Sequence, residues 1–184
     1  AFVSIVGHNH LNAALKEAGF IKPGNILNYL NKEVTKTLHQ KFEKTAVRDG
    51  MDMALCSFDP NSLKMQYAGA NNPLYIIRNG ELLETKATKR AIGSPYGEEQ
   101  MPSFTNHEIE LQKGDAVYVF SDGYADQFGG PKGKKFKYRQ FKDLLVSMQG
   151  ENMAKQKEML NDILENWMGD FEQIDDICII GFRV

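Results

Sequence analysis

The chain has 184 residues, of which 42% are hydrophobic and 25% charged, and its formal net charge is −2. This length suits one domain, residues 1–184, with a sizeable core, and the charge gives no reason to expect nucleic acid or an acidic membrane as a partner. No run is apolar enough to cross a membrane, no signal peptide is visible, and the lone cysteines, Cys56 and Cys178, predict buried free thiols in a reducing, cytoplasmic compartment.

Two helices are predicted near the start of the chain. The apolar positions of residues 2–15 fit one helical face loosely. His8 and His10 lie two residues apart, so they do not share a helix face, and surface or packing roles are favoured over metal binding. A second helix is predicted with Asn25 as its N-cap. Its apolar face consists of Ile26, Leu27, Leu30, Val34 and Leu38.

After residue 50 the hydrophobic period changes from helical to strand-like. Four strands joined by short turns predict an antiparallel meander, at residues 52–58, 63–68, 74–78 and 81–84. Strands at 104–111 and 116–120 follow as antiparallel neighbours, then helices at 141–145 and 153–167 and a buried closing strand at 177–182. Residues 129–135, rich in glycine and lysine, predict an exposed, mobile loop; a solvated loop is favoured over a basic flap beside a phosphate site.

The first candidate functional segment is Ser121-Asp122-Gly123, directly after the buried strand 116–120. It puts a carboxylate on a glycine-permitted bend at a strand end, a position that suits Mg²⁺ or Mn²⁺ because these ions prefer carboxylate oxygen. The alternative is a plain turn in which Asp122 caps its own backbone.

The second candidate segment is Asp175-Asp176, which precedes the closing strand. If the strands 116–120 and 177–182 are antiparallel neighbours, Asp122 and this pair share one edge of the sheet. Converging carboxylates repel one another, and a divalent cation relieves that repulsion. Two such ions can activate water and hold a phosphate, so hydrolysis is the favoured chemistry; taken alone, Asp175-Asp176 also fits an exposed turn.

The chain resembles the SpoIIE/RsbU branch of the PPM-type, metal-dependent serine/threonine protein phosphatases. The resemblance rests on six segments in order: residues 49–55, 67–73, 91–93, 111–115, 121–123 and 175–177. It implies an α+β fold, an α-β-β-α sandwich of antiparallel sheets flanked by helices. It also implies two Mn²⁺ or Mg²⁺ ions and attack of water on phosphoserine or phosphothreonine of a bacterial signalling protein, such as an anti-sigma-factor antagonist.

Carried over by position, the resemblance makes Asp122 and Asp175 the catalytic and metal-binding residues, with Gly123 and Asp176 completing the metal motifs. Asp49 and Asp52 fall in a family motif and are interpreted as near-site or structural.

One departure from the family pattern bears on activity. The family's Asp-x-x-Gly-His-Gly turn and first strands are expected just before a helix like residues 2–15, and they are missing here. We therefore expect a truncated domain that binds metal weakly, turns over poorly and self-associates, for instance as a homodimer, through exposed sheet edges. A non-catalytic regulatory or partner-binding module on the same fold and a purely structural α+β domain remain alternatives.

Overall fold

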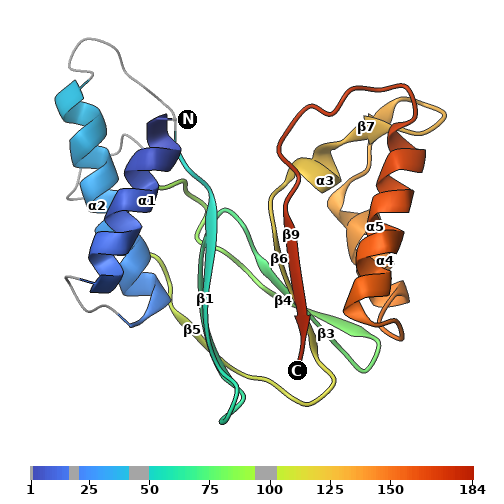
Figure 1. Cartoon of the computed structure of the whole chain (residues 1–184), viewed down its shortest axis with the longest axis horizontal. Coiled ribbons are helices and arrows are strands. Elements are labelled where there is room, and N and C mark those ends of the chain that lie inside the picture. The colour runs from blue at the N-terminus through green and yellow to red at the C-terminus, as the bar shows by residue number, and fades with distance from the viewer. Residues whose placement is uncertain (1, 17–20, 42–49, 94–102) are drawn as a thin grey trace. The chain divides into compact units, whose positions relative to one another are not determined.

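The structure is a computed structural model whose backbone divides into two compact units (Figure 1). The residues that it describes are 2–16, 21–41, 50–93 and 103–184. Unit 1 comprises Ala1–Pro73 and Thr85–Leu111, and unit 2 comprises Leu74–Glu84 and Gln112–Val184. Helices and antiparallel strands occur in both, which confirms the α+β class. No helix within the described ranges is long and apolar enough to cross a membrane.

In its described residues, unit 1 contains two helices and a three-stranded sheet of order β1-β2-β5. Its elements are α1 (Phe2–Lys16), α2 (Pro23–Lys41), β1 (Met53–Asp59), β2 (Lys64–Ala70) and β5 (His107–Glu110). Helix α2 begins at Pro23, so the prediction of Asn25 as its N-cap is wrong: the backbone N–H of Asn25 already bonds the carbonyl of Lys22 at 3.0 Å. Proline suits the first helical position because an N–H there would have no intrahelical partner.

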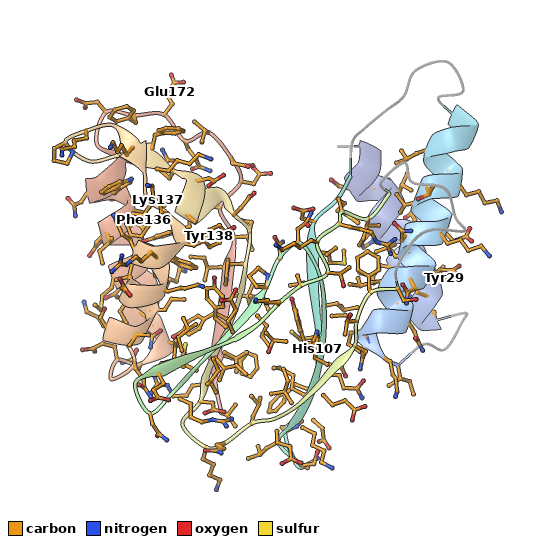
Figure 2. All side chains as sticks on the ribbon, turned by 180° about the vertical axis from the view of Figure 1, so that it is seen from behind. Tyr29, His107, Phe136, Lys137, Tyr138 and Glu172 are labelled. Carbon is orange, nitrogen blue, oxygen red and sulfur yellow. The ribbon has the colours of Figure 1, made fainter. Side chains whose placement is uncertain are left out.

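The core of unit 1 lies between α2 and the sheet. The predicted apolar face of α2 is buried, and it packs with small residues of β2 and with Ile92 and Phe104. Small side chains on β2 let the larger aliphatic side chains of α2 approach the strand closely. In the middle of β2, the buried Tyr67 stacks on His107, which Figure 2 labels, with ring centroids 5.8 Å apart.

Unit 2 contains a four-stranded antiparallel sheet of order β4-β3-β6-β9, three helices and a small hairpin. The sheet strands are β3 (Leu74–Arg78), β4 (Glu81–Thr85), β6 (Ala116–Phe120) and β9 (Ile179–Arg183). The helices and the hairpin strands are α3 (Gly123–Asp126), β7 (Phe128–Gly129), β8 (Lys134–Lys135), α4 (Tyr138–Ser147) and α5 (Met153–Met168).

The predicted four-stranded meander is wrong, because its strands belong to two different sheets. β1 and β2 pair with each other and β2 also pairs with β5, whereas β3 lies between β4 and β6. The prediction that strand 104–111 neighbours strand 116–120 fails for the same reason. Short turns fix only local hairpins, and burial decides which sheet a strand joins: Tyr75 and Ile77 of β3 lie in the core of unit 2, while Ala68 and Ala70 of β2 lie in that of unit 1.

Aromatic side chains fill the core of unit 2, where α4 and α5 cover β3 and β6 (Figure 1). Tyr118 of β6 and Tyr124 of α3 are each 1% exposed, yet both hydroxyls have partners. The Tyr118 hydroxyl donates to Oε1 of Gln156 at 2.5 Å, and that of Tyr124 donates to the carbonyl of Leu160 at 2.9 Å. Burial raises the pKa of the Tyr124 hydroxyl well above its usual value, so both tyrosines stay neutral donors that join the sheet to α5.

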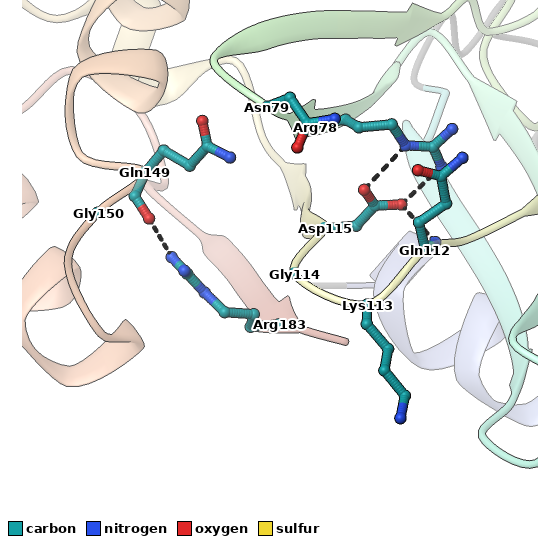
Figure 3. Close-up of a pocket in the computed structure, with 9 residues that line it drawn as sticks. All are labelled: Arg78, Asn79, Gln112, Lys113, Gly114, Asp115, Gln149, Gly150 and Arg183. Atoms are coloured by element: carbon teal, nitrogen blue, oxygen red, sulfur yellow. Dashed lines mark hydrogen bonds and ion pairs between the residues drawn. The ribbon is translucent and has the colours of Figure 1, made fainter.

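An ion pair fastens the end of β3 to the turn before β6 (Figure 3). The guanidinium of Arg78 donates from Nε and Nη2 to the two carboxylate oxygens of Asp115, at 2.9 and 2.6 Å. The backbone N–H of Gln112 adds a third bond to Asp115 at 2.8 Å. Burial alone would raise the pKa of Asp115, but these bonds hold that pKa below its usual value. Asp115, at the end of the resemblance segment 111–115, is therefore a structural anchor.

The predictions for residues 129–135 and for the two cysteines are confirmed only in part. Residues 129–135, predicted as a loop, belong to the β7–β8 hairpin, whose strands pair at Phe128↔Lys135 and Gly129↔Lys134. Both cysteines are free, but Cys178 is exposed, so its predicted burial is wrong. Cys56 is half-buried, and burial raises the pKa of its thiol to about 11. That thiol is therefore protonated at neutral pH and chemically quiet.

Candidate metal centre

Strands β6 and β9 are antiparallel neighbours, as the sequence analysis required. Their register runs to the pair Phe120↔Ile179, so the chain leaving β6 lies beside the chain entering β9. The backbone N–H of Ser121 donates to the carbonyl of Cys178 at 2.9 Å, and that of Cys178 donates to Oγ of Ser121 at 2.9 Å. Oγ in turn donates to the carbonyl of Asp176 at 2.8 Å. Ser121 thus fastens the two acidic segments together.

The bridging role of Ser121 was missed from the sequence. The residue belongs to the Ser-Asp-Gly motif, but nothing local says which distant backbone its hydroxyl will meet. A small hydroxyl residue between a buried strand and an acidic bend was the available signal, because such side chains commonly bond nearby backbone.

Asp122 occupies the N-cap position of α3, with φ −73° and ψ −16°, and its side chain makes no capping hydrogen bond. The capping bond of the alternative interpretation, from the following backbone to this carboxylate, is therefore absent from the start of α3. The residue is half-buried, and its carbonyl accepts from the N–H of Asp126 at 2.9 Å. The short helix fixes the backbone of Asp122 without using its carboxylate as the cap.

Residue 123 must be glycine because the backbone of Asp176 passes very close to it. A Cβ on this residue would lie 2.5 Å from the carbonyl oxygen of Asp176 and 3.1 Å from Cγ1 of Ile177. Gly123 begins α3 and is not among the glycines with positive φ, so the expectation of a glycine-only bend gives the wrong reason for it. The absent side chain lets the Asp175-Asp176 segment pass directly over the start of α3.

Asp175 and Asp176 are exposed at the entrance to β9. The N–H of Asp176 donates to Oδ1 of Asp175 at 2.7 Å, and Gln173 Nε2 donates to the Asp175 carbonyl at 2.7 Å. Neither carboxylate takes part in an ion pair with a lysine or arginine of the described ranges. The nearby pair, Lys135 Nζ to Asp126 Oδ2 at 2.8 Å, uses a different carboxylate.

The other candidate ligands do not belong to unit 2. Asp52 lies in unit 1, where its Oδ1 accepts from Nδ2 of Asn71 at 2.8 Å, and Asp49 lies outside the described residues. The histidines of α1 bond separately: His8 to Asn12 at 3.0 Å and His10 to Thr37 at 3.2 Å. This separation agrees with the surface and packing roles favoured above.

The donor set at the β6–β9 edge suits a hard cation. It consists of carboxylates and carbonyl oxygens, the ligands that Mg²⁺ and Mn²⁺ prefer, on two backbone segments held together by hydrogen bonds. Within the described ranges, however, no three His, Cys, Asp or Glu side chains are grouped so that they could hold an ion. The edge therefore brings two acidic segments together, with Asp122 on one and Asp175-Asp176 on the other, without grouping three such side chains.

The comparisons with solved structures find the same fold. The SiaA-PP2C domain of Pseudomonas aeruginosa is 28% identical with a TM-score of 0.85, and the match covers 100% of this chain and 70% of that one. The RsbU and RsbW domains of a Mycobacterium tuberculosis protein are 20% identical with a TM-score of 0.69, over 100% of this chain and 47% of theirs. The PP2C domain of Bacillus subtilis SpoIIE, with a regulatory-domain fragment, is 17% identical with a TM-score of 0.68, over 100% and 50%.

No curated protein sequence matches the chain. The family model described as "Stage II sporulation protein E (SpoIIE)" matches residues 1–184. Family and fold are those of PP2C-type protein phosphatases, a metal-dependent class. The chain belongs to the SpoIIE family.

Proposed function

We propose that this protein is a metal-dependent phosphatase that hydrolyses phosphoserine or phosphothreonine on a cytoplasmic signalling protein. The observation that supports the proposal most is the contact between its two acidic segments. Hydrogen bonds through Ser121 hold Asp122 beside Asp175-Asp176 at one sheet edge. Membership of the SpoIIE family supports the phosphatase class.

In this proposal the carboxylates of Asp122 and Asp175 are the metal ligands, and Asp176 is an acidic neighbour. All three belong to the hard-oxygen ligand class that Mn²⁺ and Mg²⁺ prefer. The chemistry that a pair of such ions supplies, when bound, is activation of water and charge neutralisation for attack on a phosphate ester.

The remaining residues of this edge have positioning roles. Ser121 keeps the entrance of β9 against the exit of β6 through three hydrogen bonds. Gly123 leaves room for the carbonyl of Asp176. Both fix the spacing between the two acidic segments, and a ligand set must be held to a fraction of an ångström to bind well.

A phosphorylated protein is the partner that we propose. One similar structure, described under the bacterial stressosome, is 18% identical with a TM-score of 0.57. Another, PppA, described as a key regulatory component of T6SS in Pseudomonas aeruginosa, is 14% identical with a TM-score of 0.62. Both descriptions name regulatory systems. This supports a phosphorylated regulator, such as an anti-sigma-factor antagonist, as the substrate. Self-association into a homodimer is part of the same proposal.

A non-catalytic regulatory module on the same fold is the second candidate. The finding that favours it is that the described residues gather no three ligands for an ion. The 184 residues also contain no Asp-x-x-Gly-His-Gly turn. For this reason we expect the chain by itself to hold metal weakly and to release phosphate slowly.

Manganese-dependent release of phosphate from a phosphoserine peptide separates the two candidates. The assay uses the protein as it occurs naturally and, beside it, residues 1–184 alone. We expect release that requires Mn²⁺ or Mg²⁺ and falls at least a hundredfold in Asp122→Asn, because that change removes one ligand charge and weakens the metal site. Asp143→Asn, on the exposed face of α4, is the matched control and should change the rate little.

Two results would remove the phosphatase proposal. One is a natural protein that is inert toward phosphoserine and phosphothreonine peptides with either metal. The other is phosphate release that Asp122→Asn and Asp143→Asn reduce equally.

A further inference from the structure

The β7–β8 hairpin of unit 2 carries a dense group of positive charges. Beside it lies a cavity of about 250 Å³, whose lining includes Lys132, Lys134, Lys135, Lys137, Gln140 and Trp167. No acidic residue lines this cavity. Lysines so close in sequence repel one another, so their common surface attracts anions.

Most of this charge is not used within the fold. Lys135 pairs with Asp126 at 2.8 Å, whereas Lys132, Lys134 and Lys137 form no ion pair with any residue that the structure describes. All four lysines are exposed. Asp170 and Glu172, the exposed acids that follow α5, pair with none of them, so the charge of these three lysines is not neutralised by an ion pair within the described part of the chain.

The hairpin is firmly attached to α5. The N–H of Gly130 donates to the carbonyl of Trp167 at 2.7 Å, and Nε1 of Trp167 donates to the carbonyl of Gln127 at 3.1 Å. A Cβ on Gly129 would lie 1.9 Å from that same Trp167 carbonyl, so the two segments touch backbone to backbone. The ring of Trp167 also packs edge-on against Phe136, with centroids 5.3 Å apart. Anchoring of this kind presents lysines as a defined surface rather than as a loose loop.

The hairpin is also joined to the candidate metal centre within unit 2. The backbone N–H of Lys137, which Figure 2 labels where the hairpin enters α4, donates to the carbonyl of Ala125 in α3 at 2.6 Å. Lys135 reaches Asp126, whose own N–H bonds the carbonyl of Asp122. One helical turn therefore separates the residue held by Lys135 from the proposed metal ligand.

We propose that the β7–β8 hairpin binds an acidic segment of the protein substrate, next to the phosphorylated residue. The partner's identity as a substrate rests on the proposed function; the acidic character of the bound segment rests on the lysines. A carboxylate-rich peptide complements three unpaired lysines, and Trp167 and Gln140 give it an apolar wall and an amide to lie against. The expected effect is selection among phosphoproteins by the charge that flanks the phosphate.

A second basic cavity, of about 430 Å³, lies at the other end of β6 (Figure 3). Its arginines already serve the fold: Arg78 pairs with Asp115, and Nη2 of Arg183 bonds the carbonyls of Gln149 and Glu151. The hairpin is therefore the better candidate for an anionic partner.

The test measures peptide binding by fluorescence anisotropy, with the whole chain and without metal. Two unphosphorylated peptides are compared, one rich in Glu and Asp and one with Gln and Asn at the same positions. We expect the acidic peptide to bind more tightly and Lys132→Gln/Lys134→Gln/Lys137→Gln to weaken it roughly tenfold, the combined effect of three exposed ion pairs. Raising the salt from about 0.05 M to about 0.5 M should reduce the preference in the parent chain, because the contacts are solvent-exposed.

The matched control is Lys32→Gln/Lys36→Gln/Lys64→Gln, which removes the same charge from exposed positions of unit 1. It should keep the preference for the acidic peptide, and melting curves of both triple variants confirm that they fold. Equal binding of the two peptides by the parent chain, or equal losses in the two triple variants, would overturn the proposal. Tighter hairpin-dependent binding of a single-stranded oligonucleotide than of the acidic peptide would overturn it as well.

This experiment is separate from the test of phosphatase activity because it needs neither metal nor hydrolysis. If the chain prefers acidic peptides through the hairpin but never releases phosphate, the binding surface is supported and the phosphatase proposal is overturned. If the chain releases phosphate but binds both peptides equally, the phosphatase proposal is supported and the binding surface is overturned.

Discussion

The two ends of strand β6 carry the same side chain in different settings. Asp115, directly before the strand, is 1% exposed and bonded to Arg78 and to the N–H of Gln112. Asp122, two residues after it, is half-buried, caps nothing in α3 and lies beside a second acidic segment. The first carboxylate is bonded to a guanidinium and a backbone N–H of the fold, and the second belongs to a segment that Ser121 joins to the entrance of β9. Burial and position in the fold, rather than residue type, distinguish the structural Asp115 from the candidate ligand Asp122.

Removing each carboxylate in turn tests whether the two aspartates differ in role. Asp115→Ala leaves the half-buried Arg78 without its partner and should lower the free energy of unfolding by about 3 kcal/mol. Asp122→Ala should lower it by less than about 1 kcal/mol, because that side chain does not cap its helix. Urea denaturation measures both, and equal losses would mean that the two aspartates are alike in role.

Gly123→Ala tests the contact that brings the acidic segments together. The new methyl group would meet the Asp176 carbonyl at 2.5 Å, so one of the two segments must move, at a cost of about 2 kcal/mol. Gly150→Ala is the control, since a Cβ there meets nothing within 4 Å and should change stability by less than about 0.5 kcal/mol. If both variants unfold at the same urea concentration, the close approach is not needed for stability.

Acid titration examines Asp115 by a different route. Because its folded pKa lies below the usual value of 3.8, its contribution to stability is complete above about pH 4 and is lost as the pH falls through the folded pKa. The difference in unfolding free energy between the parent chain and Asp115→Asn should therefore shrink below pH 4. A difference that stays constant down to the lowest pH at which the chain is folded would contradict the ion pair.

The smallest expected effect is a gain in stability at the basic hairpin. Lys137 has φ 73° and ψ 147°, a backbone conformation that strains any residue except glycine. Lys137→Gly should raise the unfolding free energy by about 1 kcal/mol, whereas Lys134→Gly, in strand β8, removes the same charge without that relief and should not. Thermal melts of the two variants separate strain from charge, and a loss in Lys137→Gly would show that its side chain supports the fold.

Sequence reasoning predicted the elements whose signals are local. The strands predicted at 74–78, 81–84 and 116–120 and the helix predicted at 153–167 all form, with boundaries within one residue. Antiparallel pairing of β6 with β9, the condition on which a shared acidic edge depended, is present.

Features that depend on distant backbone could not be predicted in the same way. The split of the first four strands between two sheets follows from which core buries each strand, and no short pattern encodes that choice. The Ser121 bridge and the real constraint on Gly123 both involve Asp176, more than fifty residues away in sequence. Likewise the β7–β8 hairpin is held by Trp167 at the end of α5, so its own glycines and lysines indicated only a loop.

The most direct test of the proposed metal site is a calorimetric titration of the chain with Mn²⁺, in the parent form and as Asp122→Asn and Asp115→Asn. If the β6–β9 edge holds the ion, the parent chain and Asp115→Asn bind Mn²⁺ with similar affinity, and Asp122→Asn binds at least about tenfold more weakly. If Mn²⁺ binding is unchanged in Asp122→Asn, or is lost equally in both variants, Asp122 is not a specific ligand of the ion and the proposed metal site is wrong.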